Sequence, residues 1–575
     1  MSATLLLVGC GASGTPTPQP ESISIQLPTP TPAPESAGVG SPLLGGGEVD
    51  KVFVRALSTD PDSLNPLLST NRAGAAVINL LYPVLFNLDP MTGQPSPNGA
   101  MAERWEVSQD GLTYTFYLRP NVTWSDGDPV DAADFKFTYD LLADDRVDSP
   151  NQGMTADIAR IEVLDPLTVS VQFNGIRCDA LSDLRLRWLP SHLFTPGDED
   201  FIDRVIADSF EVSAGPFLLQ SWTPRESVAL ERNETYWQGA PAIERMVLRI
   251  MPDPADRYNG LLDGSLDAIP VTAAQANDLA GNPGVTVHSA NIDGYDFIAV
   301  NLANPENPQA GRDEAGALIV QDPHPALSDP AVRQAIAYAL DYTTIVESIY
   351  LNHGYQIASN ALPVIPWAHN TQVQPYTYDP NRARQLLEEA GWIDSNSDGV
   401  REKGLASLYM NLLTTSSNNQ RAALAGLIQD QLNSVGFDIT VQEVDSTDLV
   451  KQLLAQTYDL AVFGWAGLGS DPNDELFWST RADQPGSGFN FVSYQNTTVE
   501  NLLAQANSLP GCKPEDRAPI YREVQQILHD ELPYIFLVGA TSDTAYSNHW
   551  GGIAPGPWDF YWNVQEWRDV NAPKD

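Results

Sequence analysis

The chain has 575 residues, which is too many for one hydrophobic core, so we expect two or three domains. Its 31 basic and 74 acidic residues give a net charge of −43, which argues against nucleic acid as a partner because the phosphates would be repelled. A hydrophobic fraction of 42% and 13 tryptophans indicate a packed globular protein with a strongly solvated surface.

The first 48 residues are expected to lie outside the folded body. Leu7-Val8-Gly9-Cys10 resembles a bacterial lipobox, so residues 1–10 are interpreted as a truncated lipoprotein signal with Cys10 as the lipidated residue. The apolar segment before Cys10 is too short to span a bilayer and lacks the basic residues of a signal peptide. Residues 11–48 are rich in Pro, Thr, Ser and Gly, and this composition predicts an extended tether.

Residues 101–142 give the clearest local pattern. Leu112 to Leu118 alternate between two faces with the period of a half-buried strand, and Pro120 closes the run. After a turn, Asp131 occupies a helix N-cap position, with Asp134 three residues later. We therefore predict a strand, a tight turn and a capped helix.

The other predicted elements favour an α/β protein, because helices and strands alternate in the second half of the chain. In chain order they are a strand over 52–56, a helix over 75–85, a strand over 295–302, helices that follow Asp329, Asp341 and Asp379, a helix over 420–435, a strand over 437–444, a helix over 446–456, a strand over 458–464, a helix over 521–530 and a strand over 533–538. The aromatic tail from Trp550 is predicted to pack back on the first half.

Residues 101–142 also resemble the signature region of the extracellular solute-binding proteins of peptide-type ABC importers, the family of the dipeptide-, oligopeptide- and nickel-binding proteins. Further segments similar to this family are 60–66, 215–222, 230–237, 261–267 and 332–335. The resemblance implies an α/β, two-lobe periplasmic-binding-protein-like fold (class II, cluster C type) with mixed β-sheets and an extra subdomain in lobe 1. It implies lobe 1 over 49–298, lobe 2 over 299–538 and a C-terminal return to lobe 1 over 539–575.

The same resemblance implies a membrane-tethered protein that binds a peptide or peptide-like solute between its lobes, closes about the two crossings and delivers the solute to ABC permease subunits. A non-peptide ligand such as an oligosaccharide or another amphiphile, a sensory solute receptor and, less favoured, a hydrolase on a related scaffold remain open. No nucleophile-elbow, zinc-protease or phosphate-loop motif occurs, so we expect no enzyme activity. We expect a monomer at the outer face of the bacterial membrane.

Residues 464–472 resemble the cleft segment of this family. The resemblance predicts ligand contacts from Gly464, Trp465, Ala466, Leu468 and Asp471. Leu468 stands where peptide-binding relatives carry the aspartate that accepts the ligand's α-ammonium, so a ligand with a free peptide N-terminus is in doubt. From the first lobe, equal spacing predicts ligand contacts from Ser69, Thr70, Asn71 and Arg72.

One segment matches the first half of a calcium loop, with oxygen-bearing side chains at alternate positions before Gly399. Its candidate ligands are Asp394, Asn396 and Asp398. The twelfth position, which should be a bidentate glutamate, is Leu405, so a plain surface turn is favoured over calcium. We expect no other cofactor.

Cys178 and Cys512 are the two cysteines beyond the lipobox. They could pair outside the cytoplasm, but a single pair so far apart in sequence gives no means to judge their distance. Two free thiols are slightly favoured over a disulfide.

Overall fold

The structure is a computed structural model, and it describes residues 51–570. The predicted lipidation site Cys10 and the predicted tether over 11–48 lie outside these residues. Within 51–570, no helix combines the length and the apolar composition that a membrane crossing requires.

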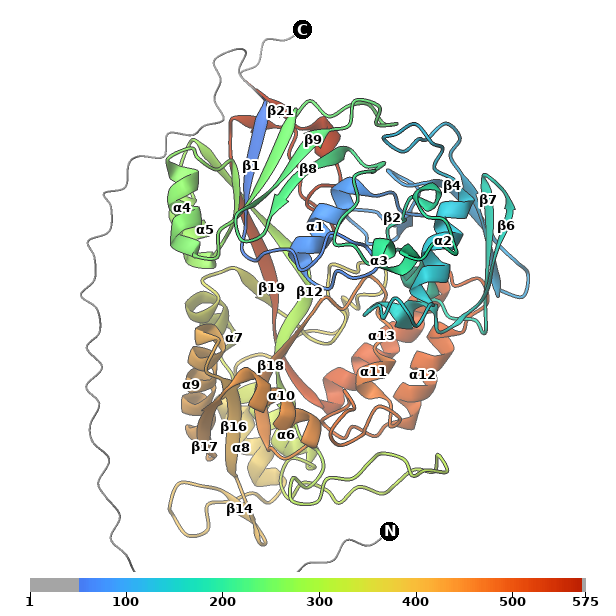
Figure 1. Cartoon of the computed structure of the whole chain (residues 1–575). Helices are drawn as coiled ribbons and strands as arrows, with labels where there is room; N and C mark the ends of the chain where they lie inside the picture. The colour runs from blue at the N-terminus through green and yellow to red at the C-terminus, as the bar shows by residue number, and fades with distance from the viewer. Residues whose placement is uncertain (1–50, 571–575) are drawn as a thin grey trace, which may run out of the picture. The chain divides into compact units, whose positions relative to one another are not determined.

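A large mixed sheet runs through the molecule (Figure 1). The order of its 11 strands is β17 (Asp438–Val444), β16 (Tyr409–Thr415), β18 (Leu460–Ala466), β12 (Val285–Val300), β19 (Tyr534–Ser547), β11 (Ala268–Val271), β1 (Val52–Leu57), β10 (Arg245–Ile250), β9 (Ser227–Arg232) and β8 (Phe217–Thr223), with β13 (Gly354–Gln356) paired to β19. β1 is parallel to β10 and β11, and β16 is parallel to β17 and β18, whereas the other pairs are antiparallel. The predicted α/β class with mixed sheets is confirmed.

Two unusually long strands connect the two lobes. β12 has 16 residues and β19 has 14, and they pair antiparallel from Val285 opposite Ser547 to Ala299 opposite Tyr534. At one end Ala545 belongs to a core cluster with β1 and β11, and at the other end Ile298 and Ile535 belong to the core of lobe 2. Both lobes therefore share one continuous pair of strands, of which only the lobe 2 ends were predicted.

Lobe 1 contains a second, separate sheet. Its strands are β4 (Ala102–Val107), β5 (Thr113–Leu118), β7 (Thr168–Phe173) and β6 (Ile158–Asp165), in this order. Its helices and those of the rest of lobe 1 are α1 (Arg72–Leu81), α2 (Ala132–Leu142), α3 (Phe201–Val205), α4 (Pro254–Leu262) and α5 (Ala273–Leu279). We call the β4–β7 sheet, its helix α2 and the chain from there to Phe210 the extra subdomain.

The predicted cap of α2 is confirmed. The Asp131 side chain accepts a hydrogen bond from the Ala133 amide at 2.7 Å, and the Asp134 side chain accepts one from the Asp131 amide at 3.1 Å. Asp134 also accepts a bond from the indole of buried Trp124 at 2.9 Å. The cap therefore joins the helix start to the lobe 1 core.

The helix predicted over 75–85 is wrong in its bounds, because α1 spans Arg72–Leu81. Asn71 begins it by accepting a hydrogen bond from the Gly74 amide at 2.7 Å. The backbone is extended at Tyr82, as expected for a residue that precedes proline, here Pro83.

Lobe 2 contains the helices α6 (Pro330–Ala339), α7 (Tyr342–Thr344), α8 (Pro380–Glu389), α9 (Asn419–Asn433), α10 (Ser446–Ala455), α11 (Glu475–Trp478), α12 (Thr497–Asn507) and α13 (Pro514–Glu531). The predicted caps Asp329, Asp341 and Asp379 each accept a backbone hydrogen bond in the first turn of α6, α7 and α8. Shorter strand pairs are β2 (Asn87–Leu88) with β3 (Pro95–Ser96), β14 (Glu402–Lys403) with β15 (Ala406–Ser407) and β20 (Trp550–Gly551) with β21 (Arg568–Asp569).

The C-terminal tail returns to lobe 1, as predicted. Trp550 and Trp567 are buried in the lobe 1 core, with ring centroids 5.3 Å and 5.2 Å from that of Phe53. Aromatic pairs at such distances add to the stabilisation from apolar burial. The core of lobe 1 is thus built from both ends of the described chain.

The prediction of two free thiols is wrong, because Cys178 and Cys512 form a disulfide with their Cα atoms 5.0 Å apart. Cys178 follows β7 in the extra subdomain, and Cys512 lies in the turn between α12 and α13 of lobe 2. The bond joins positions separated by 334 residues, a proximity that only the folded chain creates.

Two buried carboxyl groups should make stability depend on pH. Burial raises the pKa of Asp474 and of Asp483 from the ordinary 3.8 to about 7 in each case. Between these values the folded state binds more protons than the unfolded chain, so the free energy of unfolding falls as the pH rises. We expect a higher melting temperature at about pH 5 than at about pH 8, measured by differential scanning calorimetry.

The negative net charge also makes the free energy of unfolding fall as the pH rises. A variant is therefore needed to isolate the contribution of the buried carboxyl group of Asp483. Asp483→Asn should flatten the pH profile, whereas Asp430→Asn, at an exposed position of α9, should leave it unchanged. A melting temperature that rises steadily from about pH 5 to about pH 8 would contradict this account.

Candidate functional site

Three adjoining cavities run from the crossing strands to the disulfide. Two of them are lined by residues of both lobes, and the one between them is lined by lobe 1 and the C-terminal return alone. The first, which we call the central cavity, has a volume of about 450 Å³ and is lined by α1, the crossing strands β12 and β19, Gly467 and residues 555–561. The arginine cavity, of about 350 Å³, shares Asn79, Trp558 and Asp559 with it. The outer cavity, of about 270 Å³, shares Leu88 and Arg185 with the arginine cavity and extends to the disulfide. Such concave, partly apolar spaces are typical of small-ligand sites.

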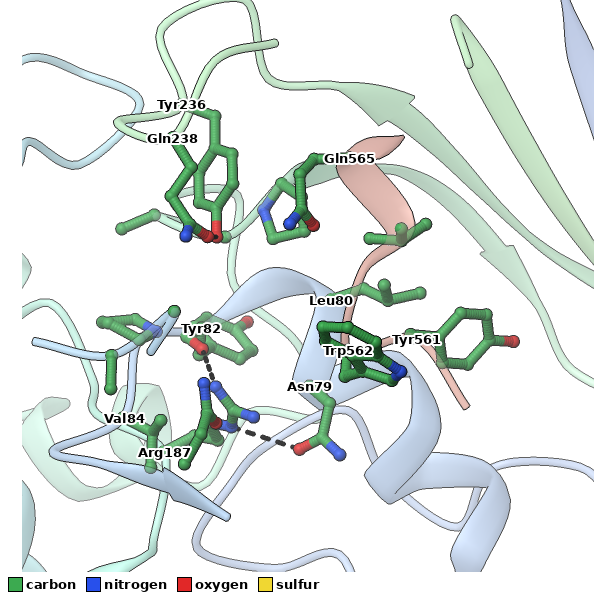
Figure 2. Close-up of a pocket in the computed structure, with 18 of the residues that line it drawn as sticks. Asn79, Leu80, Tyr82, Val84, Arg187, Tyr236, Gln238, Tyr561, Trp562 and Gln565 are labelled. Atoms are coloured by element: carbon green, nitrogen blue, oxygen red, sulfur yellow. Dashed lines mark hydrogen bonds between the residues drawn. The ribbon is translucent and has the colours of Figure 1, made fainter. Parts of the chain in front are cut away.

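Arg185 and Arg187 define the character of the arginine cavity. The Arg187 side chain donates hydrogen bonds to the Asn79 side-chain oxygen and to the Tyr82 carbonyl, both at 3.1 Å (Figure 2). Among residues 51–570, the Arg185 guanidinium forms no hydrogen bond or ion pair and faces the cavity. Desolvation by the surrounding protein lowers the pKa of Arg185, although this residue is exposed, and lowers that of half-buried Arg187 to about 10, so both remain cationic at neutral pH.

The acids near these arginines do not neutralise them. Asp559 and Glu566 also line the arginine cavity, but within the described chain neither forms an ion pair with an arginine. Burial raises the pKa of Asp559 in spite of the nearby guanidinium groups, which weakens it as a counter-charge. Arg185 is exposed and Arg187 half-buried, and neither has a paired anion among the described residues, so the cavity favours an anionic group of a ligand that would cover them.

Aromatic side chains form the remaining walls. Trp237, Trp558 and Trp562 line the arginine cavity, and the guanidinium of Arg55 lies 3.7 Å from the ring centroid of Phe560 in the central cavity. Such faces suit the flat or apolar parts of a solute, while the arginines fix its charged end.

The predicted first-lobe residues divide into two roles. The hydroxyls of Ser69 and Thr70 donate hydrogen bonds to Asp62 at 2.9 and 2.6 Å, and Asn71 caps α1. Burial raises the pKa of Asp62, but these bonds outweigh it and lower the pKa to about 2. Arg72, the first residue of α1, instead lines the central cavity together with Gly467 of lobe 2.

The predicted segment around Trp465 is the end of β18. Gly464, Trp465 and Ala466 pair with Asp296, Tyr295 and Gly294 of β12. The Trp465 ring stacks on Phe477 with centroids 4.5 Å apart. The segment that follows, from Gly467, enters the cavities.

Leu468 and Asp471 lie at the lobe 2 side of the interface. Asp471 forms an ion pair with buried Arg517, whose two terminal nitrogens donate hydrogen bonds at 2.6 and 2.8 Å. Leu468 lies beside Asp293, which accepts a hydrogen bond from the Gly469 amide at 2.9 Å and lines the central cavity. Asp293 therefore supplies a carboxylate near Leu468, the position at which the resemblance would place an aspartate.

Sequence reasoning missed Arg185, Arg187, Asp293 and Asp559. The run Arg185-Leu186-Arg187-Trp188 contained a signal, because in an extended segment alternate residues share a face and here both are arginine. With only 31 basic residues in the chain, two on one face before a buried tryptophan are notable.

The predicted calcium loop brings acidic groups together at the surface. Carboxylate oxygens of Asp394, Asp398 and Glu402 lie within 4.8 Å of one another. The Asn396 side-chain amide donates hydrogen bonds to Asp398 at 3.0 Å and to Glu402 at 2.8 Å. Glu402, at the ninth position, is thus part of the cluster.

The two lobes, the paired crossing strands and the cavities between them define a solute-binding protein. The family model of the bacterial extracellular solute-binding proteins, family 5 Middle, matches residues 96–487. The chain belongs to this family, as predicted, and family 5 proteins of this kind serve ABC importers outside the cytoplasm.

Known relatives cover nearly the whole chain. Heme-binding protein A of Haemophilus influenzae is 24% identical over 546 residues, which cover 89% of this chain and 91% of that protein. Glutathione-binding protein GsiB of Salmonella paratyphi A is 26% identical over 514 residues, which cover 88% and 92%. The structure of HbpA2 from Haemophilus parasuis matches with a TM-score of 0.74 at 21% identity, covering 90% of this chain and 99% of that one.

Proposed function

We propose that this protein captures a peptide-like solute that carries at least one anionic group and delivers it, chemically unaltered, to an ABC permease. The observation that carries the proposal is the pair Arg185 and Arg187, which face the arginine cavity without an ion-pair partner in the part of the chain that the structure describes. A carboxylate can accept two parallel hydrogen bonds from one guanidinium, which gives both affinity and orientation.

Three observations support this choice. Glutathione and heme, which two relatives are named for binding, each carry two carboxylates. A neutral oligosaccharide bound there would remove both cations from water without pairing their charge. Asp293 in the central cavity offers a partner for an ammonium group, so a zwitterionic peptide-like solute fits even though Leu468 does not supply the charge.

The direct test is mass spectrometry of the small molecule that co-purifies with the protein, followed by isothermal titration with the identified compound. We expect an organic anion that is recovered unchanged after incubation. A neutral sugar or a purely cationic compound in the cleft would contradict the proposal, and conversion of the solute would indicate an enzyme.

The predicted contacts from Ser69 to Arg72 and from Gly464 to Asp471 belong to the same proposal. Arg72 is the first-lobe member that lines a cavity, and Leu468 and Asp471 line cavities from lobe 2. Ser69, Thr70 and Asn71 would act by fixing the start of α1.

The proposed site of action is the outer face of the membrane, with Cys10 as the lipid attachment point. Mass spectrometry of the N-terminal peptide from a membrane fraction should show a lipidated cysteine, and Cys10→Ser should release the protein into the soluble fraction. An unmodified N-terminus in the membrane fraction would contradict the anchor.

The calcium hypothesis predicts that chelator-treated protein releases or absorbs heat when calcium is added. Asp394→Asn/Asp398→Asn should abolish that signal, because a hard cation needs the carboxylate oxygens. The pair Asp126 and Asp128, near His192, is a second surface acidic cluster, so its Asn variants form a matched control. If the loop variant and the control variant give the same calcium titration, the loop is a plain turn.

A further inference from the structure

The disulfide connects the two lobes on the side of the cavities that faces away from the crossing strands. β12 and β19 line the central cavity, this cavity adjoins the arginine cavity, and the outer cavity beyond it is lined by Cys178 and Cys512. Figure 1 shows α12 and α13, which flank Cys512, below the extra subdomain and apart from β12 and β19. The ligand space is thus enclosed between a continuous strand pair at one end and a covalent bond at the other.

Non-covalent contacts position the two cysteines across the same interface. The Asn507 side-chain oxygen at the end of α12 accepts hydrogen bonds from the amides of Cys178 at 2.9 Å and Asp179 at 3.2 Å. The Asn473 side chain of lobe 2 donates a hydrogen bond to Asp179 at 2.9 Å. These contacts place the two cysteines opposite each other in one register.

The bond does not lie inside a single core. Ala180 and Leu184, just after Cys178, belong to the lobe 1 core, whereas Leu503 and Ala506, just before Cys512, belong to a separate core of lobe 2. A bond within one core would restrict only the unfolded chain. A bond between two cores also restricts how far the folded lobes can separate.

We propose that Cys178–Cys512 is a redox latch that holds the cleft closed, so that solute exchange requires reduction of this bond. The proposal rests on the cavities being the ligand site of the proposed function. Without the latch the lobes can pivot about β12 and β19, as a hinge closure requires. With the latch formed, the far side of the cleft cannot open.

The reductant is a dithiol, either a small molecule or a thiol-disulfide oxidoreductase outside the cytoplasm. One of its thiolates attacks Sγ of Cys512, which is half-buried and lines the outer cavity, whereas Cys178 is 9% exposed. A mixed disulfide forms, and Cys178 leaves as a thiolate and takes up a proton. The second thiol then attacks the mixed disulfide and releases Cys512 as a thiol, so two electrons and two protons pass to the protein and the dithiol becomes a disulfide.

The experiment measures opening without a ligand, so its outcome does not depend on which solute is bound. The full-length protein is compared before and after treatment with dithiothreitol by small-angle scattering and by hydrogen exchange of α1 and residues 464–472. Reduction should increase the radius of gyration and accelerate exchange of these segments by about 100-fold, the low end of the gain from linking two contact surfaces. Removal of the reductant and reoxidation should reverse both changes.

Variants distinguish the effect of the covalent bond from that of the neighbouring hydrogen bonds. Cys178→Ser/Cys512→Ser should behave like the reduced protein and ignore dithiothreitol, whereas Asn507→Ala removes the neighbouring hydrogen bonds but should stay closed while oxidised. If the double variant does not fold, the reversible reduction of the wild-type protein decides the question.

Equal scattering and exchange in the oxidised, reduced and double-serine proteins would overturn the latch. Two free thiols in protein purified from an oxidising compartment would overturn it as well. A neutral co-purified solute, in contrast, would refute the proposed anion recognition and leave these opening measurements valid.

Discussion

Replacing Arg187 by glutamine is expected to weaken binding of the co-purified anion by at least about 30-fold, because removal of one partner from a buried charge pair costs about 2–5 kcal/mol. Glutamine retains hydrogen-bonding ability towards Asn79 and Tyr82 but loses the charge. Arg185→Gln should weaken binding less, because that guanidinium is exposed, although it has no other partner among residues 51–570. Isothermal titration of each variant with the identified solute measures the loss.

Two matched variants make this result specific. Arg160→Gln changes an exposed arginine that is paired with Glu162, so binding should be unaffected. Arg185→Lys keeps a point charge but not the planar fork, and it should fall between wild type and Arg185→Gln. Unchanged affinity in both glutamine variants would show that the solute lies elsewhere.

Replacing Asp471 by alanine is expected to lower the free energy of unfolding by about 3–5 kcal/mol, because it leaves Arg517 as an uncompensated buried charge. Arg517 has a side-chain exposure of 3% and donates hydrogen bonds to both carboxylate oxygens. Urea unfolding followed by circular dichroism, in oxidised protein, measures the change.

Replacing Arg517 together with Asp471 tests whether the uncompensated buried charge causes the loss of stability. Asp471→Ala/Arg517→Met should recover most of the loss, since replacing both members of a buried pair by apolar residues is often neutral. Glu162→Ala, which breaks the exposed pair with Arg160, should change stability by no more than about 1 kcal/mol. If the double variant is no more stable than Asp471→Ala, loss of packing and not the buried charge is responsible.

Local chemistry made much of the fold predictable. The caps at Asp131, Asp329 and Asp379 were found because a side chain and the amides it bonds lie within a few residues of one another. The strand over 112–118 was found because period-two alternation needs no knowledge of its partner strands.

The missed features depend on residues that only the fold brings together. The first half of β12 contains His288, Asn291 and Asp293, polar residues that indicate a loop in isolation. His288 and Asn291 are extended because β19 pairs with them, and Asp293 lies at the irregularity that follows. The same applies to Arg185 and Arg187, which become a site only when α1 and the C-terminal tail form the opposite wall of the cavity.

The tail that carries Trp550 and Trp567 has a consequence for the order in which the protein can mature. Phe53 on β1 is made well before the rings of Trp550 and Trp567 that cover it. Contacts so distant along the chain close large loops and form slowly. The first lobe therefore keeps an open apolar face until residues 550–567 have been made and have packed onto it.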